Sequence, residues 1–156
     1  MNDRVELIDR FYRSFQALDA PQMASCYHDE VRFSDPAFPD LRGSAAGAMW
    51  AMLCDRAQAF SLTYSDVEAD NQRGRAHWEA RYVFSATGRS VHNRIDAEFE
   101  FRDGRIVRHI DRFDFWRWSR MALGPAGLVL GWTPFLKRKV QSQAAENLER
   151  YRAGQT

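Results

Sequence analysis

The hydrophobic period of this sequence changes near residue 60, and that change limits the folds that the chain can adopt. Beyond it, apolar and polar residues alternate over the segments 61–69, 75–85, 90–101 and 105–116. Alternation of this kind predicts half-buried strands. The connections DNQRG, ATGR and RDGR are turn-like, and Asp103-Gly104 is typical of a tight hairpin. Four consecutive strands joined by short turns must pair as an antiparallel meander.

The predicted sheet has two chemically different faces. One face is apolar and aromatic, with Ala76, Trp78, Ala80, Tyr82, Phe84, Val91, Ile95, Ala97, Phe99 and Phe101. The other face is charged, with Arg75, His77, Glu79, Arg81, Arg94, Asp96, Glu98 and Glu100. An antiparallel sheet of this type packs its apolar face on a core and exposes the other to solvent or to a partner.

Helical periodicity precedes the meander. Residues 3–18 carry one apolar stripe and can be capped by Asn2 or Asp3. A second helix is predicted over 20–28 with Asp19 near its cap, and a third over roughly 45–59 with Ser44 as its cap. Three helices can cover the apolar face of the sheet, and a twisted sheet wrapped over helices leaves a concave space between the two layers.

The remaining segments are a short strand, a loop and a long C-terminal stretch. Glu30–Ser34 alternates like a strand, and DPAFPDLRG (35–43) is predicted to be a loop. The segment 119–135 is apolar and glycine-rich, so we expect an apolar loop before a helix of roughly 134–152. The extension 119–156 is too hydrophobic to stay solvated and is expected to pack on the domain or on a dimer mate.

Composition excludes several classes of protein. A chain of 156 residues suits one domain, and a net charge of +1 gives no electrostatic drive toward nucleic acid. Cys26 and Cys54 lack metal-ligand spacing and are expected to be free buried thiols. We find neither a signal peptide nor an apolar run that could span a bilayer, so a cytoplasmic protein is the expectation. No glycine-rich phosphate loop, nucleophile elbow or zinc spacing occurs, so no cofactor is implied.

Four stretches carry a family resemblance: FYRSFQALD (11–19), CYHDEVRFSDPAF (26–38), LRG (41–43) and IVRHIDRFDFW (106–116). With the order of elements, they resemble the nuclear transport factor 2-like superfamily, and within it the SnoaL-like branch of polyketide cyclases and ketosteroid isomerase-like proteins. The resemblance covers residues 3–118, so we expect a domain over 1–118 and an extension over 119–156. It implies an α+β fold, in which a cone-shaped (cystatin-like) curved antiparallel sheet wraps around three N-terminal helices. It also implies an apolar pocket and a homodimer through the outer face of the sheet.

Asp35 is the first candidate catalytic residue, because it follows a short strand in the sequence FSDP. In the ketosteroid isomerases that the chain resembles, the aspartate of a similar motif moves a proton beside a carbonyl. Such a base needs a carboxylate at the mouth of an apolar cavity, where partial desolvation can raise its pKa. The alternative is that Asp35 only bonds to the backbone of its own loop.

His109 and Asp111 are the second candidate group. Alternation places both on the face of Val107, Phe113 and Phe115, while Ile106 and Ile110 fall on the other face with Arg108 and Arg112. SnoaL-type cyclases similarly place an acid–base aspartate on a strand of this sheet, and Asp111 resembles it in position. The alternative is a purely structural pair, satisfied by hydrogen bonds near the end of the sheet.

The predicted pocket wall is mainly aromatic. Its members are Phe11, Tyr12, Trp50, Trp78, Tyr82, Asn93 and Phe113. Asn93 is preferred to His92 because alternation puts it on the face of Trp78.

The oxyanion hole of the steroid isomerases is poorly matched in this sequence. Its tyrosine falls on Phe11, next to Tyr12, and its protonated acid falls near Ala97, next to Asp96 on the charged face. His28, Asp29 and Glu30 are adjacent residues that rarely converge on a metal, and we expect a solvated turn.

Three functions remain open at this point. The first is cofactor-independent acid–base chemistry on an apolar carbonyl or epoxide, by isomerisation, cyclisation or epoxide hydrolysis. The second is a non-catalytic ligand-binding or dimerisation module of the same fold. The third, which the sequence favours least, is a protein that touches membranes through 119–135.

Overall fold

The alternating segments form one six-stranded sheet in the computed structural model, which describes residues 2–154. The meander is confirmed, because β3 (Ser61–Ala69), β4 (Arg73–Phe84), β5 (Arg89–Arg102) and β6 (Arg105–Arg112) pair in succession and antiparallel. β1 (Tyr27–Ser34) lies parallel to β6, and the two-residue β2 (Leu41–Arg42) pairs with β1 inside the predicted loop. The strand order is therefore β2-β1-β6-β5-β4-β3.

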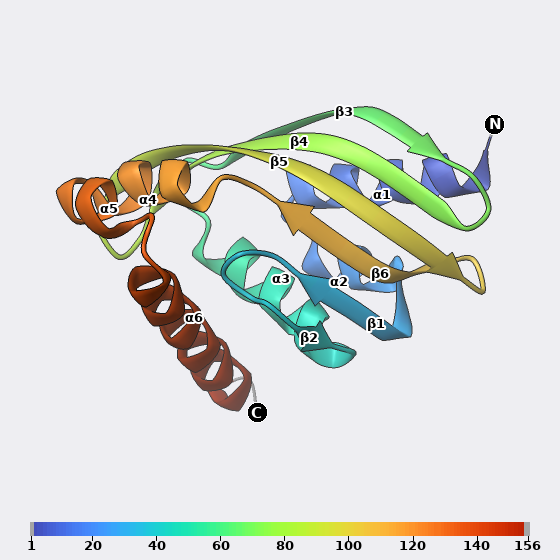
Figure 1. The fold of residues 1–156 in the computed structure, drawn as a ribbon. Coiled ribbons are helices and arrows are strands. Elements are labelled where there is room, and N and C mark those ends of the chain that lie inside the picture. Colours follow the sequence, from blue (N-terminus) through green and yellow to red (C-terminus); the bar gives the residue numbers. More distant parts are fainter. Residues whose placement is uncertain (1, 155–156) are drawn as a thin grey trace.

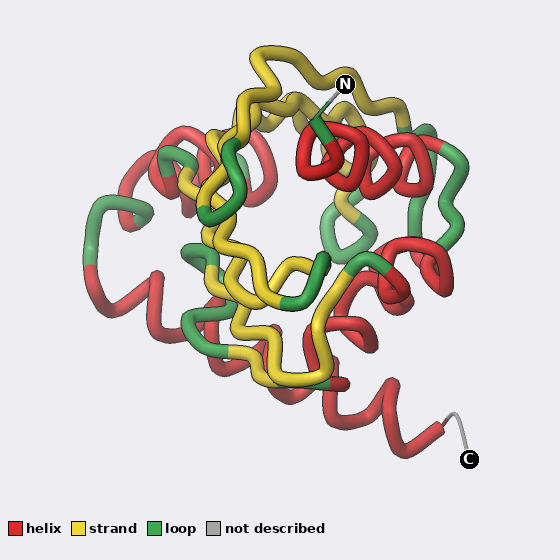
Figure 2. The backbone as a smooth tube through the Cα atoms, turned by 90° about the vertical axis from the view of Figure 1, so that its right-hand side faces the viewer, coloured by secondary structure: helices red, strands yellow, loops and turns green. Residues whose placement is uncertain are grey.

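Three helices cover the apolar face of the sheet, as predicted: α1 (Asp3–Gln16), α2 (Ala20–Ser25) and α3 (Ser44–Arg56). Figure 2 shows the strands as a curved wall, with these helices closing its open side. The predicted α+β class with a curved, cone-like sheet is confirmed.

The first two helices begin at the predicted caps. The side chain of Asn2 accepts a hydrogen bond from the Arg4 amide (2.8 Å), and that of Asp19 accepts one from the Gln22 amide (3.2 Å). The third helix is present, but its predicted cap is wrong. Gly43, at φ 57°, occupies the cap position without a side-chain bond, and Ser44 is the first helical residue.

Two predicted boundaries near β1 are also wrong. The second helix ends at Ser25 rather than at residue 28, and the strand then begins at Tyr27. His28 and Asp29 therefore lie in a strand, where a solvated turn was expected. The register between β1 and β6 shifts between Tyr27 and Arg32, which breaks the alternation that would have marked the start of this strand.

The C-terminal stretch is helical, which corrects the predicted loop over 119–135. It forms α4 (Phe115–Leu123), α5 (Pro125–Leu130) and α6 (Pro134–Gly154). The last strand ends at Arg112, short of the predicted residue 116, because the side chain of Asp114 accepts a bond from the Arg117 amide (3.0 Å) and starts α4. Gly124, at φ 67°, separates α4 from α5.

The long helix α6 packs against α3, as Figure 1 shows. Its Leu136 and Leu148 are buried. Gln141 Nε2 donates to the carbonyl oxygen of Pro36 (3.1 Å), and the hydroxyl of Tyr151 donates to Asp55. The division of the chain into a domain over 1–118 and an extension over 119–156 stays a prediction.

The core lies between the sheet and α1–α3. One residue assigned to the charged face belongs to it instead: Ile106 is fully buried. The register between β5 and β6 shifts between Glu100 and Phe101, so simple alternation fails at the start of β6. From Arg108 onward the alternation holds, and His109 and Asp111 point inward.

Candidate functional site

His109 lies at the centre of an aromatic cluster. Its side chain is 0% exposed, and its ring centroid lies 4.5 Å from that of Phe99 and 5.0 Å from that of Phe33. The rings of Phe11 and Trp50 lie 5.5 Å and 6.2 Å away. A polar ring among apolar ones must find hydrogen-bond partners, because an unpaired buried polar group is costly.

A chain of hydrogen bonds supplies those partners. Trp50 Nε1 donates to the hydroxyl oxygen of Tyr27 (2.8 Å), which lies 2.8 Å from His109 Nδ1. On the other side of the ring, His109 Nε2 lies 2.9 Å from Asp111 Oδ1. Trp78 Nε1 also donates to Asp111 Oδ1, at 3.3 Å. Side chains from α3, β1, β4 and β6 thus meet in one buried network.

The donors and acceptors of this network fit one tautomer. An indole N–H can only donate, so the Tyr27 oxygen accepts from Trp50 and donates its own proton to His109 Nδ1. Nε2 then carries the imidazole proton and donates it to Asp111, which is 3% exposed. Every proton is placed when His109 is neutral and Asp111 is a carboxylate. Both bonds to Asp111 go to Oδ1, and its Oδ2 accepts none from the described residues.

One hydroxyl in this interior has no partner. The phenol oxygen of Tyr12 is buried and makes no hydrogen bond to any described residue. Burial raises the pKa of Tyr12 well above its ordinary value, and the charge of nearby Asp111 adds to the rise. Leaving such a group unpaired costs about 1–3 kcal/mol, so this O–H is a ready donor for a polar atom of a ligand.

Asp35 follows β1 and bonds to its own loop. Its Oδ1 accepts from the amides of Ala37 (2.7 Å) and Phe38 (2.6 Å). Although the residue keeps some exposure, burial raises its pKa to about 7, with a further rise from Asp111 and an opposing effect from the Phe38 and Ala37 amides. The loop-bonding alternative is thus realised, yet the carboxyl also has the pKa of an acid–base group. Its Oδ2 accepts no bond from the described residues.

The pairing of β1 with β6 explains why Asp35 and Asp111 are neighbours. The parallel register aligns Phe33 with His109 and Ser34 with Ile110, and β1 ends there, so Asp35 leaves the strand next to the part of β6 that carries Asp111. Besides burial, the charge of Asp111 acts on Asp35 and raises its pKa, which shows that the two carboxyls are close. When one of two neighbouring carboxyls is ionised, its negative charge disfavours ionisation of the other and raises the pKa of that other carboxyl.

The predicted wall residues fall into two groups. Phe11, Tyr12, Trp50 and Trp78 are buried in the main core around His109. Tyr82 and Phe113 are partly buried, and both pack against this core and against a second cluster of Val91, Phe115, Trp118 and Ala122. Asn93 is buried and points inward, whereas His92 points outward to Glu79. Tyr82 and Phe113 thus connect the two clusters.

Sequence reasoning missed two residues of this region, Tyr27 and Trp118. Tyr27 fell in a predicted helix, although its spacing from Phe33 matches the inward positions of β1. Trp118 was missed because the last strand was predicted to continue to residue 116, which hid the start of α4. Its Nε1 donates to the Tyr82 hydroxyl (3.0 Å). Burial raises the pKa of Tyr82, while the Trp118 bond opposes the rise and Asp35 adds to it.

The described residues contain no group of three or more His, Cys, Asp or Glu side chains that could hold a metal ion. His28 bonds to Asp103 and Glu30 to Arg102, so the adjacent acids and histidine at 28–30 diverge. Over the same residues, no helix is both long enough and apolar enough to cross a membrane.

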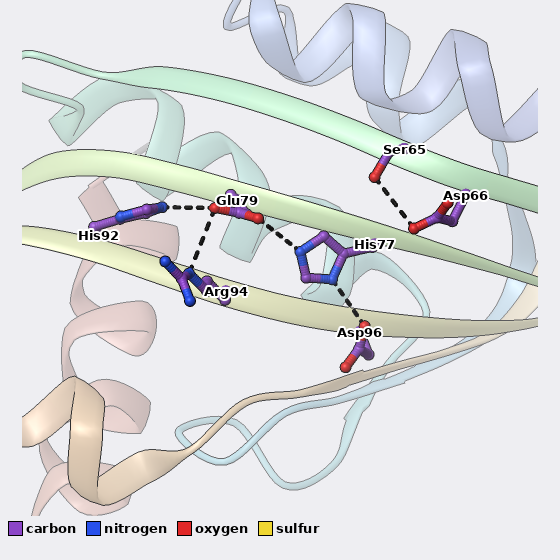
Figure 3. Close-up of polar contacts among 7 residues, drawn as sticks. All are labelled: Ser65, Asp66, His77, Glu79, His92, Arg94 and Asp96. Atoms are coloured by element: carbon purple, nitrogen blue, oxygen red, sulfur yellow. Dashed lines mark hydrogen bonds and ion pairs between the residues drawn. The ribbon is translucent and has the colours of Figure 1, made fainter.

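The outer face holds a separate titratable network (Figure 3). His77 lies 2.9 Å from both Asp96 and Glu79, and His92 Nε2 lies 2.7 Å from Glu79. The bonds to Asp96 and Glu79 raise the pKa of His77, while His77 and His92 lower that of Glu79 to about 2. The stabilisation from His77 is present below the unfolded pKa of about 6.5 and is lost as the pH rises through the folded pKa. The stabilisation from Glu79 is present above its unfolded pKa of about 4.5 and is lost as the pH falls toward its folded pKa of about 2. Both contributions are therefore fully present between about pH 4.5 and 6.5.

Comparison with known families matches residues 8–109 to the SnoaL-like domain. This chain belongs to the SnoaL-like family. The match runs from Ile8, within α1, to His109, within β6. It includes Asp35 but not Asp111 or the three C-terminal helices. Comparison with curated proteins gives no match.

Several solved structures are similar to this SnoaL-like protein over most of its length. An epoxide hydrolase of the LEH-like type from Mycobacterium tuberculosis has a TM-score of 0.66 at 19% identity, covering 82% of this chain and 96% of that one. A putative polyketide cyclase from Xanthomonas campestris has a TM-score of 0.64 at 19% identity, covering 76% and 96%. A Catenulispora acidiphila protein with a ketosteroid isomerase-like fold, in complex with trimethylamine, has a TM-score of 0.68 at 11% identity. The match covers 83% of this chain and 98% of that one. At these identities the likeness establishes the fold alone.

Proposed function

We propose that this SnoaL-like protein carries out cofactor-independent acid–base chemistry on an apolar small molecule with a carbonyl or epoxide group. The proposal rests on the proximity of Asp35 and Asp111: Asp35 directly follows β1, which pairs with the strand of Asp111, and besides burial the charge of Asp111 raises the pKa of Asp35. Each carboxyl also keeps one oxygen without a partner among the described residues. A pair of carboxyls with separated pKa values can serve as an acid and a base in one site. We also retain the cytoplasm as its proposed location.

The two carboxyls would have different tasks. Asp35, with a pKa of about 7, is present in both protonation states near neutral pH, so it can accept a proton and return it. Asp111 is fixed by His109 and Trp78, and its charge helps to hold the pKa of Asp35 up. His109 is a positioning residue, because Tyr27 and Asp111 occupy both of its ring nitrogens.

Two reaction types fit this arrangement. In an isomerisation, Asp35 would remove a proton beside a carbonyl and return it at another carbon, while the Tyr12 hydroxyl donates a hydrogen bond to the carbonyl oxygen. In epoxide hydrolysis, one carboxyl would protonate the epoxide oxygen as the C–O bond breaks, and the other would accept a proton from the attacking water, giving a diol. Both reactions can use Asp35, because its pKa of about 7 makes the neutral and the ionised carboxyl available near neutral pH.

The test is turnover of a panel of apolar epoxides and β,γ-unsaturated ketones by the wild type and by Asp35→Asn. We expect Asp35→Asn to lose at least about 100-fold in kcat, a typical effect of removing an acid–base group. Asp40→Asn is the matched control, since Asp40 lies in the same loop but is exposed and pairs with Arg42 (3.1 Å). Full activity in Asp35→Asn, with a substrate that the wild type converts, would refute the assigned role.

A non-catalytic ligand-binding module is the second candidate. The observation that favours it is the completeness of the Trp50–Tyr27–His109–Asp111–Trp78 chain, which could serve only to stabilise the core. This alternative predicts that wild type, Asp35→Asn and Asp111→Asn bind an apolar ligand with similar affinity and that none of them turns over any member of the panel.

We further propose that the protein forms a homodimer through the outer face of β4 and β5. This face continues onto β3 and β6. It carries paired charges, such as Arg75 with Glu68 of β3 and Arg112 of β6 with Glu98, around the partly buried Ile110 of β6. A groove on the same face is lined by Ile110 together with Arg108 and Arg112. Exposed ion pairs contribute little, so apolar contacts at Ile110 should decide the affinity.

Sedimentation at micromolar concentration checks the dimer. The wild type is expected to sediment as a dimer, and Ile110→Glu should sediment as a monomer because a charge would be buried in the interface. Leu18→Ser, at an exposed position at the end of α1, should leave the dimer intact. A wild type that sediments as a monomer would rule the interface out.

A further inference from the structure

The short helix α5 and the turn after it expose an unusual set of large apolar side chains. We call residues 128–135 the apolar tip. Trp132 is 72% exposed, Val129 and Phe135 are each 63% exposed, and Leu128 and Leu130 are also exposed. Figure 1 shows α5 at the end of the molecule farthest from the N-terminus, beyond the ends of the long strands β4 and β5. Adjacent exposed apolar residues of this size mark an interaction surface rather than ordinary protein surface.

The apolar tip is held in place by its contacts with α4. A Cβ added at Gly127 would lie 1.9 Å from the carbonyl oxygen of Ser119, so only glycine permits this close approach. Trp116 Nε1 donates to the Leu128 carbonyl oxygen (3.2 Å), and Trp132 Nε1 donates to that of Val129 (2.8 Å). The exposure of these side chains is therefore built into the fold of α4 and α5.

The charge around the tip is one-sided. Residues 115–145 include five basic residues and no acidic one. Arg117 and Arg120 on α4, with Arg89 on β5, line a depression of about 650 Å³ beside the tip. The guanidinium of Arg120 lies over the ring of Trp116, 4.2 Å from its centroid, which joins the basic surface to the apolar one.

These basic side chains lack the acidic partners found elsewhere. Arg75, Arg108 and Arg112 on the outer face of the sheet each pair with a glutamate. In the part of the chain that the structure describes, no carboxylate lies within 4.0 Å of the charged nitrogens of Arg89, Arg117 or Arg120, and the same holds for Lys137, Arg138 and Lys139. Unpaired cations around an apolar tip indicate a partner that is both apolar and anionic.

We propose that the apolar tip binds peripherally to an anionic membrane surface, with Trp132 and Phe135 among the acyl chains and the arginines at the phosphate headgroups. Tryptophan and phenylalanine beside basic residues are typical of segments that lie in the membrane interface. Each basic residue near an anionic leaflet contributes about 1 kcal/mol of attraction. A second copy of the same tip fits less well, because it would bring two unpaired basic surfaces together. The proposal does not depend on the acid–base chemistry proposed above.

The test is co-sedimentation of the full chain with vesicles of phosphatidylcholine alone and of phosphatidylcholine mixed with phosphatidylglycerol. We expect binding to the anionic vesicles and little binding to the neutral ones. Trp132→Ser/Phe135→Ser should abolish binding, and Arg117→Glu/Arg120→Glu should weaken it by about tenfold or more. The matched control is Leu18→Ser/Leu53→Ser, which removes two apolar side chains that are exposed on other parts of the surface and should bind like the wild type.

Three results would overturn the proposal. One is a wild-type protein that stays in the supernatant with both kinds of vesicle. Another is equal binding by the wild type and the Trp132→Ser/Phe135→Ser variant. The last is a wild type that ignores vesicles but sediments as a dimer which the same variant converts to a monomer, since the tip would then be an interface between copies. Circular dichroism of each variant verifies that a loss of binding is not a loss of folding.

Discussion

Replacing Asp35 with asparagine is expected to make the protein more stable at pH 8 than the wild type, and to make little difference at pH 4. Burial raises the pKa of Asp35 from 3.8 to about 7, so the folded state holds this proton more tightly than the unfolded state does. As the pH rises from 3.8 to 7, the wild type therefore loses stability, and the loss is complete above 7. A pKa change of this size corresponds to up to about 4 kcal/mol of unfolding free energy.

Urea denaturation of both proteins between pH 4 and pH 8 measures this effect. Asparagine can still accept from the amides of Ala37 and Phe38 through its Oδ1, so the loop bonds that hold Asp35 are largely retained. Asp40→Asn is again the control and should follow the wild type at every pH. Parallel stability curves for the wild type and Asp35→Asn would show that the carboxyl is ordinary in the folded protein and would remove the basis of its proposed role.

Replacing His109 with alanine is expected to lower the free energy of unfolding by about 3–5 kcal/mol. The change removes the ring between Tyr27 and Asp111 and leaves a buried carboxylate bonded only to Trp78. Removing only the histidine is more costly than removing both partners, because the buried carboxylate then keeps a single hydrogen-bond donor. The empty volume among Phe33, Phe99 and Trp50 adds to the loss.

A pair of further variants separates the charge from the volume. His109→Phe keeps a ring in the aromatic cluster but still strands Asp111, so it should remain strongly destabilised. His109→Phe combined with Asp111→Leu removes both partners and should recover most of the lost stability. Urea denaturation provides all three values. A His109→Ala variant within about 1 kcal/mol of the wild type would show that the network contributes little.

Much of this fold could be predicted because the periodic signal was strong where packing is regular. The alternation in β4 and β5 identifies the inner face, and Trp78 and Asn93 lie on it as predicted. The prediction failed where a local interaction interrupts the pattern. A register shift brings Ile106 into the core, and a side-chain cap at Asp114 ends a strand that the pattern would have continued. Glycine and proline around Gly124 suggested a loop, although there they terminate and start short helices.

The candidate site was only partly predictable for a similar reason. Alternation within one strand places His109 and Asp111 on one face, since only local pattern is needed. The neighbourhood of Asp35 and Asp111 depends on β1 pairing in parallel with β6, and the sequence pattern carries no register between strands so far apart. Tyr27 was missed because its strand begins three residues before the alternation becomes regular.

The pairing of the first long strand with the last one sets the order in which the protein can fold. The turns between β3 and β6 are short, so the meander can form from contacts that are close in sequence. Pairing β1 with β6 instead brings together two strands separated in sequence by the whole meander. This costs conformational entropy, which is offset only when the contacts of the complete sheet form. We therefore expect Asp35 to reach Asp111 only after the meander has formed. A growing chain on the ribosome would have no acid–base pair until β6 has emerged, and a local opening of β1 would separate the two carboxyls without unfolding the meander.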